Sequence, residues 1–365
     1  MKIRAAVTQG PGQPFLLQEA ELEAPREDEI LVKIIAVGVC HTDLVFKDGN
    51  LIPAPAVLGH EGSGIVERVG ARVHKVAPGD RVAISFRSCG HCARCASGDP
   101  AYCHTMPLLN YIGMRTDGSR ALSIDGAPVA GNFFGQSSFA TYAITYERNV
   151  VKVPDGLPLE LAGPLGCGIQ TGAGGIMRSL AATPGSSLLI TGGGAVGLSA
   201  VMGARIRGCA TIIVVEPHAA RRDLAREFGA THVLDPREAS DLATAVRAIV
   251  PTGVDYAFDT TGAPAVQQAV MATLAPKGVF GIVGVTPPGT PMPGDMNTVM
   301  TFGHTVVGII EGDSEPDVFI PELVKLYLEG RLPFDRMITT YPFEQINEAI
   351  AAQHHGDCVK AVLLM

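Results

Sequence analysis

Four cysteines within 15 residues form the densest group of reactive side chains in the sequence: Cys89, Cys92, Cys95 and Cys103, spaced C-x2-C-x2-C-x7-C. Two-residue gaps let neighbouring thiolates converge on one ion, and zinc binds four thiolates as a tetrahedron at about 2.3 Å. An iron–sulfur cluster or disulfides are the alternatives. A closed four-thiolate site has no open coordination position, so we expect a structural zinc.

Two further cysteines and one histidine lie in separate glycine-flanked segments. Cys40 lies in Gly38-Val-Cys-His-Thr-Asp43, His60 in Gly59-His-Glu-Gly62 and Cys167 in Pro164-Leu-Gly-Cys-Gly168. Each segment follows a hydrophobic run, where a loop can present a side chain to a cleft. Two thiolates and one imidazole form a ligand set for a catalytic zinc with an open fourth position. Taken singly, each residue fits a buried structural role at least as well.

A glycine-rich segment, Gly192 to Gly197, matches G-x-G-x-x-G and follows an apolar run. Its glycines allow a tight turn and close approach of a pyrophosphate, and the following helix N-terminus attracts phosphate. The next predicted strand ends at Glu216. Its carboxylate can hold both ribose hydroxyls of NAD and would repel the 2′-phosphate of NADP, so NAD is the favoured cofactor. The predicted cofactor contacts here are Gly192, Gly194, Ala195, Val196, Gly197, Glu216 and Arg221. Arg221 or Arg222 could instead accommodate a 2′-phosphate, and an unliganded glycine turn is the other alternative.

The elements that position these motifs change in character along the chain. Short β-branched runs at 30–37, 64–69, 81–85 and 140–145 predict a β-rich, barrel-like domain. From about residue 186, strands (187–191, 211–216) alternate with helices (195–207, 219–228), and the alternation continues to residue 285, which predicts a parallel sheet. We expect a catalytic domain at 1–165 with a metal lobe at about 88–104, a dinucleotide-binding domain at 166–302, and a return to the first domain at 303–365.

Taken together, the motifs resemble those of the zinc-dependent medium-chain alcohol dehydrogenases over essentially the whole chain. The matching segments include Cys40-His-Thr-Asp43, Gly59-His-Glu-Gly-Ser-Gly64, the four-cysteine lobe, Gly166-Cys-Gly168 and Asp259-Thr-Thr-Gly262. Segments at 132–140, 163–172 and 311–314 are similar to the bacterial aryl-alcohol and terpene-alcohol branch. The resemblance implies an α/β protein with a GroES-like catalytic domain and a doubly wound Rossmann domain.

The resemblance also implies roles for single residues. Cys40, His60 and Cys167 would hold the catalytic zinc, with Glu61 approaching the metal from behind. Asp43 would brace His60 and fix its tautomer. Thr42 would conduct the proton of the alcohol toward the nicotinamide ribose. The family often has a histidine where this chain has Val45, so the proton must reach water from the ribose or through His41.

Other positions follow from their places in the matching segments. Further cofactor contacts are expected at Thr171, Val283, Val285 and Lys360, and candidate walls of the substrate pocket are Phe86, Phe139 and Val285. Zinc lowers the pKa of a bound hydroxyl, so hydride can then leave the alcohol carbon for nicotinamide. We therefore expect reversible oxidation of a hydrophobic primary alcohol, aryl or terpene, with two zinc ions per chain and NAD.

Composition limits the setting. A net charge of -8 disfavours nucleic acid as a partner, and no apolar stretch reads as a signal peptide or a membrane span. Eight cysteines without a secretion signal favour metal binding in a reducing cytoplasm. The resemblance implies a homodimer or homotetramer. The rival hypotheses are a glutathione-linked formaldehyde, short-chain alcohol or polyol dehydrogenase on the same scaffold, and a non-catalytic NAD-binding protein.

Overall fold

The computed structural model describes residues 1–238 and 241–365. They divide into two compact units. Unit 1 comprises Met1–Cys167, Glu315–Leu328 and Asp335–Met365, and unit 2 comprises Gly168–Ser314 and Glu329–Phe334. Within the described residues, we find no helix whose length and hydropathy would let it cross a membrane.

Unit 1 contains two mostly antiparallel sheets. Five strands are ordered β4-β1-β2-β7-β8, and seven form a second sheet, β10-β6-β5-β3-β18-β17, with β9 also paired to β3. Their bounds are β1 (Lys2–Thr8), β2 (Phe15–Leu22), β3 (Glu29–Gly38), β4 (Ala56–Val57), β5 (Glu61–Val69), β6 (Arg81–Ile84), β7 (Leu122–Ile124), β8 (Ala127–Val129), β9 (Tyr142–Tyr146), β10 (Val150–Lys152), β17 (Ile338–Pro342) and β18 (Lys360–Leu364). Strand β3 is buried at nearly every position because β5, β9 and β18 all pair with it.

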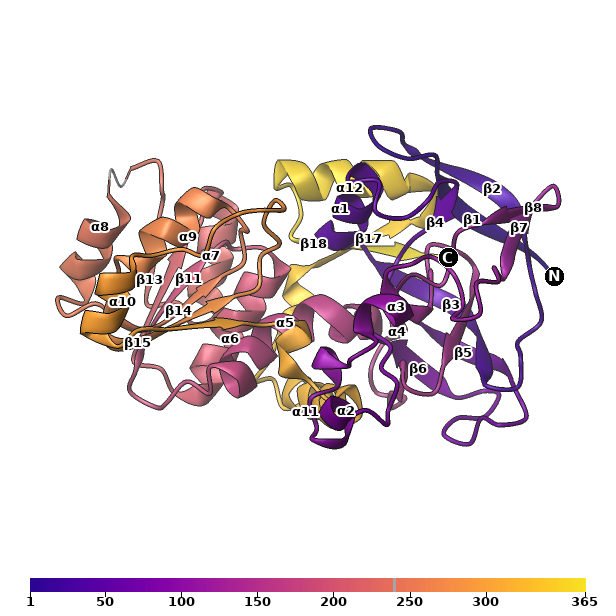
Figure 1. Cartoon of the computed structure of the whole chain (residues 1–365), viewed down its shortest axis with the longest axis horizontal. Coiled ribbons are helices and arrows are strands. Elements are labelled where there is room, and N and C mark those ends of the chain that lie inside the picture. Colours follow the sequence, from indigo (N-terminus) through magenta and orange to yellow (C-terminus); the bar gives the residue numbers. More distant parts are fainter. Residues whose placement is uncertain (239–240) are drawn as a thin grey trace. The chain divides into compact units, whose positions relative to one another are not determined.

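The C-terminal segment completes unit 1. Strand β18 pairs antiparallel with β3, so the yellow C-terminal strands lie beside the indigo N-terminal ones in Figure 1. The α-helices of unit 1 are α1 (His41–Asp48), α2 (Ala93–Ala96), α3 (Met106–Asn110), α4 (Leu159–Pro164), α11 (Pro316–Leu328) and α12 (Ile346–His355).

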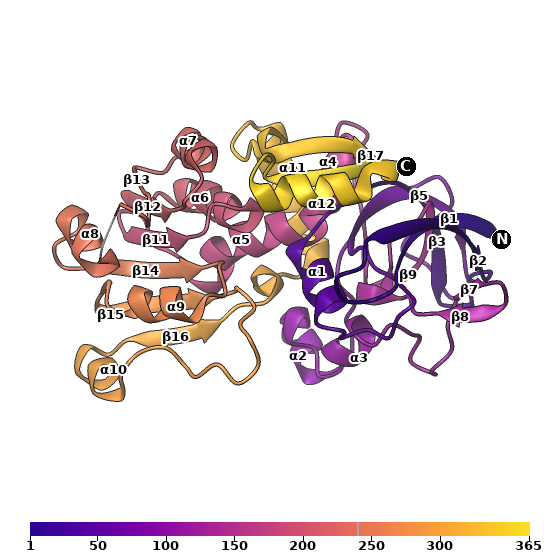
Figure 2. The same cartoon turned by 90° about the horizontal axis from the view of Figure 1, so that it is seen from above.

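Unit 2 is a doubly wound parallel sheet with strand order β13-β12-β11-β14-β15-β16, which can be followed in Figure 2. The winding reverses between β11 and β14, so their carboxyl ends mark the edge where such sheets bind ligands. Its strands are β11 (Ser187–Thr191), β12 (Thr211–Val215), β13 (His232–Leu234), β14 (Val254–Asp259), β15 (Leu274–Ile282) and β16 (Thr305–Gly308). Its α-helices are α5 (Gln170–Gly174), α6 (Ala195–Arg207), α7 (Ala219–Phe228), α8 (Leu242–Ile249), α9 (Pro264–Met271) and α10 (Met296–Phe302).

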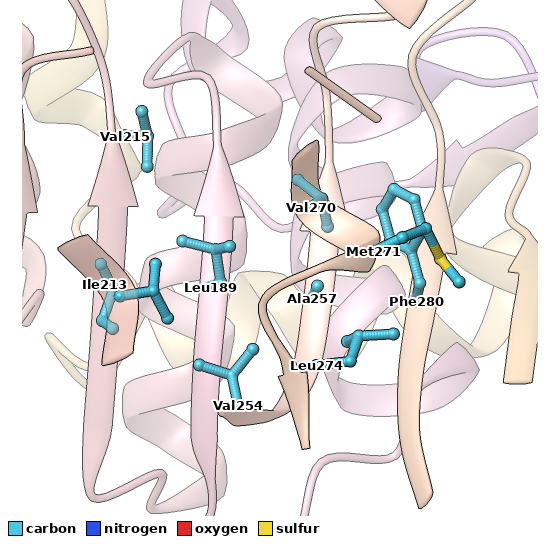
Figure 3. Close-up of a cluster of buried hydrophobic side chains, with 10 residues drawn as sticks. Leu189, Ile213, Val215, Val254, Ala257, Val270, Met271, Leu274 and Phe280 are labelled. Atoms are coloured by element: carbon cyan, nitrogen blue, oxygen red, sulfur yellow. The ribbon is translucent and has the colours of Figure 1, made fainter. Parts of the chain in front are cut away.

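A hydrophobic core fixes the central strands of this sheet. Leu189, Ile213 and Ala257 on the strands pack with Val270 of α9 and Phe280 of β15 (Figure 3). These side chains are fully buried, and burying a large aliphatic or aromatic side chain contributes about 1.5–3 kcal/mol. The carboxyl ends of the strands are thereby held at fixed positions.

The predicted fold class is confirmed. Strand 187–191 and helices 195–207 and 219–228 have the predicted bounds. Residues 303–314 and 329–334 differ from the expected return to the first domain, since both segments belong to unit 2, the first because β16 pairs with β15. Gly166 and Cys167, expected in the second domain, belong to unit 1.

Candidate active site and metal centres

Residues from three separate segments of unit 1 form one cluster that could hold a metal ion, here called the metal-binding cluster. Cys40 precedes the first turn of α1, His60 precedes β5, and Glu61 begins that strand. Cys167 lies in a π-helical turn, Leu165–Ile169, rather than in the expected loop. One ligand atom from each of Cys40, His60, Glu61 and Cys167 lies within 4.8 Å of the others, and the two sulfurs are 4.0 Å apart.

Asp43 orients His60 within this cluster. The His60 Nδ1–H donates to Asp43 Oδ1 at 2.9 Å, and both side chains are completely buried. Asp43 also accepts from the main-chain N–H of Gly59 at 2.9 Å and of Cys40 at 3.2 Å. Because Nδ1 carries the proton, the lone pair of Nε2 is available to a metal.

The imidazole of His60 is also held by stacking. The ring of Phe134 lies parallel to it at 4.4 Å, with an interplanar angle of 21°. Phe134 has a left-handed backbone, with φ 51°, a conformation that costs a residue with a Cβ energy unless its surroundings fix it. Sequence reasoning missed this contact, because nothing in a Phe-Phe pair indicates a left-handed turn.

Burial and charge at the cluster favour a bound cation. The Nε2 of His60 is buried and has no hydrogen-bond partner within the described residues. A hydrogen bond from Cys167 lowers the pKa of Cys40 well below its usual value. Burial opposes the charge on His60, but Asp43 and Cys40 raise its pKa well above the usual value. Two thiols and an unpartnered imidazole nitrogen are the donor set that fits zinc.

Glu61 sits behind these ligands and pairs with Lys360. The Lys360 Nζ lies 2.7 Å from Glu61 Oε1 and donates to the Val39 carbonyl at 3.0 Å. Both side chains are buried, and burial raises the pKa of Glu61 while Glu61 raises that of Lys360. A Cβ at Gly38 would come within 2.0 Å of the Glu61 carboxylate. Lys360 therefore reaches the metal cluster, and its predicted cofactor contact stays a prediction.

The four-cysteine lobe forms a second cluster in unit 1. The sulfurs of Cys92 and Cys95 are 3.6 Å apart, those of Cys89 and Cys95 3.9 Å, and those of Cys92 and Cys103 4.0 Å. These separations are far longer than a disulfide bond. They match the edge of about 3.8 Å of a tetrahedron of thiolates around one zinc ion.

The ionisation of these thiols is unequal. Hydrogen bonds lower the pKa of Cys92 to about 5, and the largest contribution comes from the main-chain N–H of His104. Burial raises the pKa of Cys95 to about 12. A dication would stabilise all four thiolates together, since metal binding displaces thiol protons.

The glycine-rich loop of unit 2 joins β11 to α6. Gly192 has φ 95°, and a Cβ at Gly197 would lie 1.9 Å from the Gly192 carbonyl oxygen. Gly194 precedes α6, and a Cβ added to it would have no atom within 4 Å outside its neighbouring residues. The three glycines thus provide a tight turn, an accessible backbone and close helix packing, as a dinucleotide-binding loop requires. Ala195 and Val196 form the first turn of α6.

Glu216 lies at the carboxyl end of β12 beside this loop. Its carboxylate is 3% exposed and accepts from the Gly193 N–H at 2.7 Å and the His218 N–H at 2.8 Å. Arg222 lies 3.0 Å from Asp235 and donates to the Glu216 and Pro217 carbonyls, so its charge is already paired. Arg221 is partly buried on α7.

The remaining predicted residues are distributed over both units. Thr42 is half-buried in the first turn of α1, and His41 is exposed. In unit 2, Thr171 donates to Glu311 at 3.5 Å, Val283 follows β15, and Val285 is 63% exposed.

The predicted pocket residues fall into two classes. Phe86 and Phe139 are buried in unit 1, whereas Val285 belongs to unit 2. Phe139 meets Phe15 edge-on at 5.6 Å and fills the space beside Gly59. It therefore packs in the core beside the His60 segment, and its place in the wall of a substrate pocket stays a prediction.

Comparisons with known proteins agree with this geometry. Residues 26–155 match the family model for the alcohol dehydrogenase GroES-like domain, and residues 195–328 match that for zinc-binding dehydrogenase. Geraniol dehydrogenase of Castellaniella defragrans is 49% identical over 362 residues, covering 99% of this chain and 97% of that protein.

Two solved structures are similar to this chain over its whole length. Benzyl alcohol dehydrogenase of Acinetobacter calcoaceticus is 42% identical with a TM-score of 0.96, covering 100% of this chain and 99% of that one. An alcohol dehydrogenase zinc-binding domain protein from Burkholderia ambifaria is 49% identical with a TM-score of 0.97 and the same coverage. The family implies zinc and NAD or NADP as cofactors. With the metal-binding cluster in unit 1 and the dinucleotide loop in unit 2, the chain is an alcohol dehydrogenase and belongs to the zinc-binding dehydrogenase family.

Proposed function

We propose that the chain reversibly oxidises hydrophobic primary alcohols of the aryl or terpene class to aldehydes, with hydride transfer to NAD. The observation that carries the proposal is the convergence of Cys40, His60 and Cys167 around the unpartnered Nε2 of a buried histidine. The names of the two relatives, geraniol dehydrogenase and benzyl alcohol dehydrogenase, support the substrate class.

Cys40, His60 and Cys167 would hold the catalytic zinc. Glu61 lies close enough to replace one of them as a ligand. A zinc ion bound there supplies Lewis acidity toward an alcohol oxygen. The chain's own contribution is positional: Asp43 fixes the ring of His60 through Nδ1, and Phe134 covers its face. Cys89, Cys92, Cys95 and Cys103 would hold a second, structural zinc.

Thr42 is the proposed conductor of the alcohol proton. Its hydroxyl both donates and accepts hydrogen bonds, but its pKa is far too high for it to act as a base. It lies two residues after Cys40 in the first turn of α1. With Val45 in place of a relay histidine, a bound cofactor's ribose or His41 would be the group that passes this proton on to water.

We assign NAD rather than NADP because of the charges around the glycine loop. The buried Glu216 carboxylate lies 2.7 Å from the Gly193 nitrogen, where it would bind ribose hydroxyls and repel a 2′-phosphate. Arg222, which could have balanced a phosphate, is paired with Asp235. NAD bound there supplies the acceptor for hydride. Replacing Glu216→Ala should narrow the preference for NAD, measured as the ratio of kcat/KM values with NAD and NADP.

A substrate panel tests the proposed function. Metal analysis is combined with NAD reduction on benzyl alcohol, geraniol, ethanol and sorbitol. The proposal expects two zinc ions per chain and higher kcat/KM for benzyl alcohol and geraniol than for the other two. Activity confined to sorbitol would overturn the substrate class, and a chain inactive on all four with both metals bound would overturn the proposal.

The proposal also includes a setting: a cytoplasmic homodimer or homotetramer. The eight cysteines are all free thiols, which supports a reducing compartment. The family resemblance supports the assembly of two or four copies, which light scattering would measure.

A further inference from the structure

Two aspartate–hydroxyl pairs join the central strands β11 and β14, one at each end. At the amino ends, the Ser187 hydroxyl donates to Asp255 at 2.7 Å. At the carboxyl ends, the Thr191 hydroxyl donates to Asp259 at 2.6 Å, and these two residues are opposite each other in the sheet. Asp255 is exposed, whereas Asp259 is completely buried.

The carboxylate of Asp259 accepts four hydrogen bonds besides the one from Thr191. Its further donors are the Thr261 N–H at 3.1 Å, the Thr261 hydroxyl at 2.7 Å, the Gly262 N–H at 3.1 Å and the Gln267 amide at 3.0 Å. The two oxygens offer about four acceptor positions, so the five donors occupy all of them. The main-chain carbonyl of Asp259 accepts from the N–H groups of Val283 and Gly284, both at 3.1 Å.

Three loops therefore meet at Asp259: the glycine loop after β11, the 260–262 loop after β14 and the loop after β15. Their backbones are packed closely. A Cβ at Gly192 would lie 2.3 Å from the Thr260 hydroxyl oxygen, and one at Gly262 would lie 2.2 Å from the Val285 carbonyl oxygen. A displacement of one loop must therefore move its neighbours.

These loops lie at the carboxyl ends of the strands flanking the winding reversal, where doubly wound sheets bind ligands. Two of them carry the proposed NAD contacts at Gly192–Gly197, Val283 and Val285. We propose that Asp259 is a positioning residue for the dinucleotide, a buried carboxyl group whose hydrogen bonds hold all three loops in the binding conformation before the cofactor arrives. This inference rests on the proposed function, since it needs a dinucleotide at the glycine loop.

The matched pair of aspartates provides the test. Asp259→Asn keeps the shape of the side chain but replaces one of its two acceptor oxygens with an NH2 group. That NH2 group would face the N–H and O–H donors that now bond to the oxygen. Asp255→Asn makes the same change at the other end of the same two strands. We expect Asp259→Asn to raise the Kd for NADH roughly tenfold to a hundredfold, the order expected when hydrogen bonds to a buried charge are lost. Asp255→Asn should leave this Kd unchanged, and both variants should retain wild-type zinc content.

Fluorescence titration with NADH measures Kd, and steady-state kinetics separate KM for NAD from KM for the alcohol. The loss should appear in KM for NAD. Equal NADH affinity of Asp259→Asn and wild type would overturn the inference, as would equal losses in the two aspartate variants. A wild-type chain that binds neither NADH nor NADPH would instead overturn the proposed NAD site, and this inference with it.

A milder pair of variants covers the case in which Asp259→Asn does not fold. Thr191→Val removes one of the five donors and keeps the side-chain volume, and Ser187→Ala is its counterpart at the amino ends. We expect Thr191→Val to weaken NADH binding several-fold and Ser187→Ala to have no effect on it. Unchanged binding by Thr191→Val would contradict the positioning role.

Discussion

Asp43 connects three parts of the metal-binding cluster through hydrogen bonds to His60 and to the main-chain N–H groups of Gly59 and Cys40. Asp43→Asn would remove the charge and turn one acceptor into a donor. Because such outer partners of a metal ligand are worth about ten- to a hundredfold in affinity, we expect the catalytic zinc to dissociate that much more readily. Competition with a chromophoric chelator measures this.

The control for this substitution is on the same helix. Asp48 is exposed and bonds to Lys47 and the Gly12 N–H, so Asp48→Asn should give the wild-type competition curve. The four-cysteine lobe does not involve Asp43, and its zinc should be retained in both variants. A wild-type curve for Asp43→Asn would show that His60 does not depend on this carboxylate.

At the residue scale, sequence reasoning predicted the candidate ligands that the structure brings together, but not their surroundings. Cys40, His60 and Cys167 were predicted together through a family resemblance, since their spacing alone does not show that they converge. Lys360 was predicted only as a cofactor contact, yet its ammonium pairs with Glu61, 299 residues away. A contact of that sequence separation depends on β18 pairing with β3, which no local pattern encodes.

At the element scale, replacing either of two glycines in the glycine loop by alanine should have a different effect on the stability of the chain. Gly197→Ala would place a methyl 1.9 Å from the Gly192 carbonyl, so we expect a loss of stability of about 1–3 kcal/mol, as for overpacking. Gly194 has no atom near its Cβ position, so Gly194→Ala should cost under about 1 kcal/mol, the N-cap preference. Chemical denaturation measures both.

Cofactor binding completes this comparison. The open space at Gly194 suits a pyrophosphate close to the backbone, so Gly194→Ala should weaken NADH binding although the folded chain is stable. Near-wild-type binding by Gly194→Ala would mean that the pyrophosphate does not approach this backbone. Gly156, which also has free space around it but lies in unit 1, provides the control substitution Gly156→Ala.

The four-cysteine lobe has little regular secondary structure. Between β6 and α3 it contains only α2, of four residues, and one short 3-10 turn. Cys95→Ala removes a buried ligand, so we expect one zinc fewer per chain and faster proteolysis within 88–104, since the metal contributes the folding energy of such lobes. Metal content and limited proteolysis test this, and an undiminished zinc content would refute the ligand assignment.

Elements with a strong repeating pattern were the ones that sequence could predict. Strand 187–191 and helices 195–207 and 219–228 have their predicted bounds, because an apolar strand followed by glycines and a helix is a local signal. The strand predicted at 211–216 ends one residue earlier, at Val215. The segment around Cys167 was not predicted as helical. Its glycines, Gly166 and Gly168, indicate a loop, whereas tertiary packing holds it in a π-helical turn, a form often found at functional sites.

At the scale of the whole molecule, the proposed metal ligands and the proposed cofactor-binding residues belong to different units. All eight proposed metal ligands lie in unit 1, and the glycine loop, Glu216 and Asp259 lie in unit 2. Removal of both metals with a strong chelator should therefore abolish alcohol oxidation while the Kd for NADH stays within about twofold of its original value. Activity should return with added zinc and not with magnesium, because thiolate and imidazole donors favour the softer ion. If NADH binding were lost together with the metals, before any loss of far-UV circular dichroism, the cofactor would require the metal-binding cluster and this division between the units would be wrong.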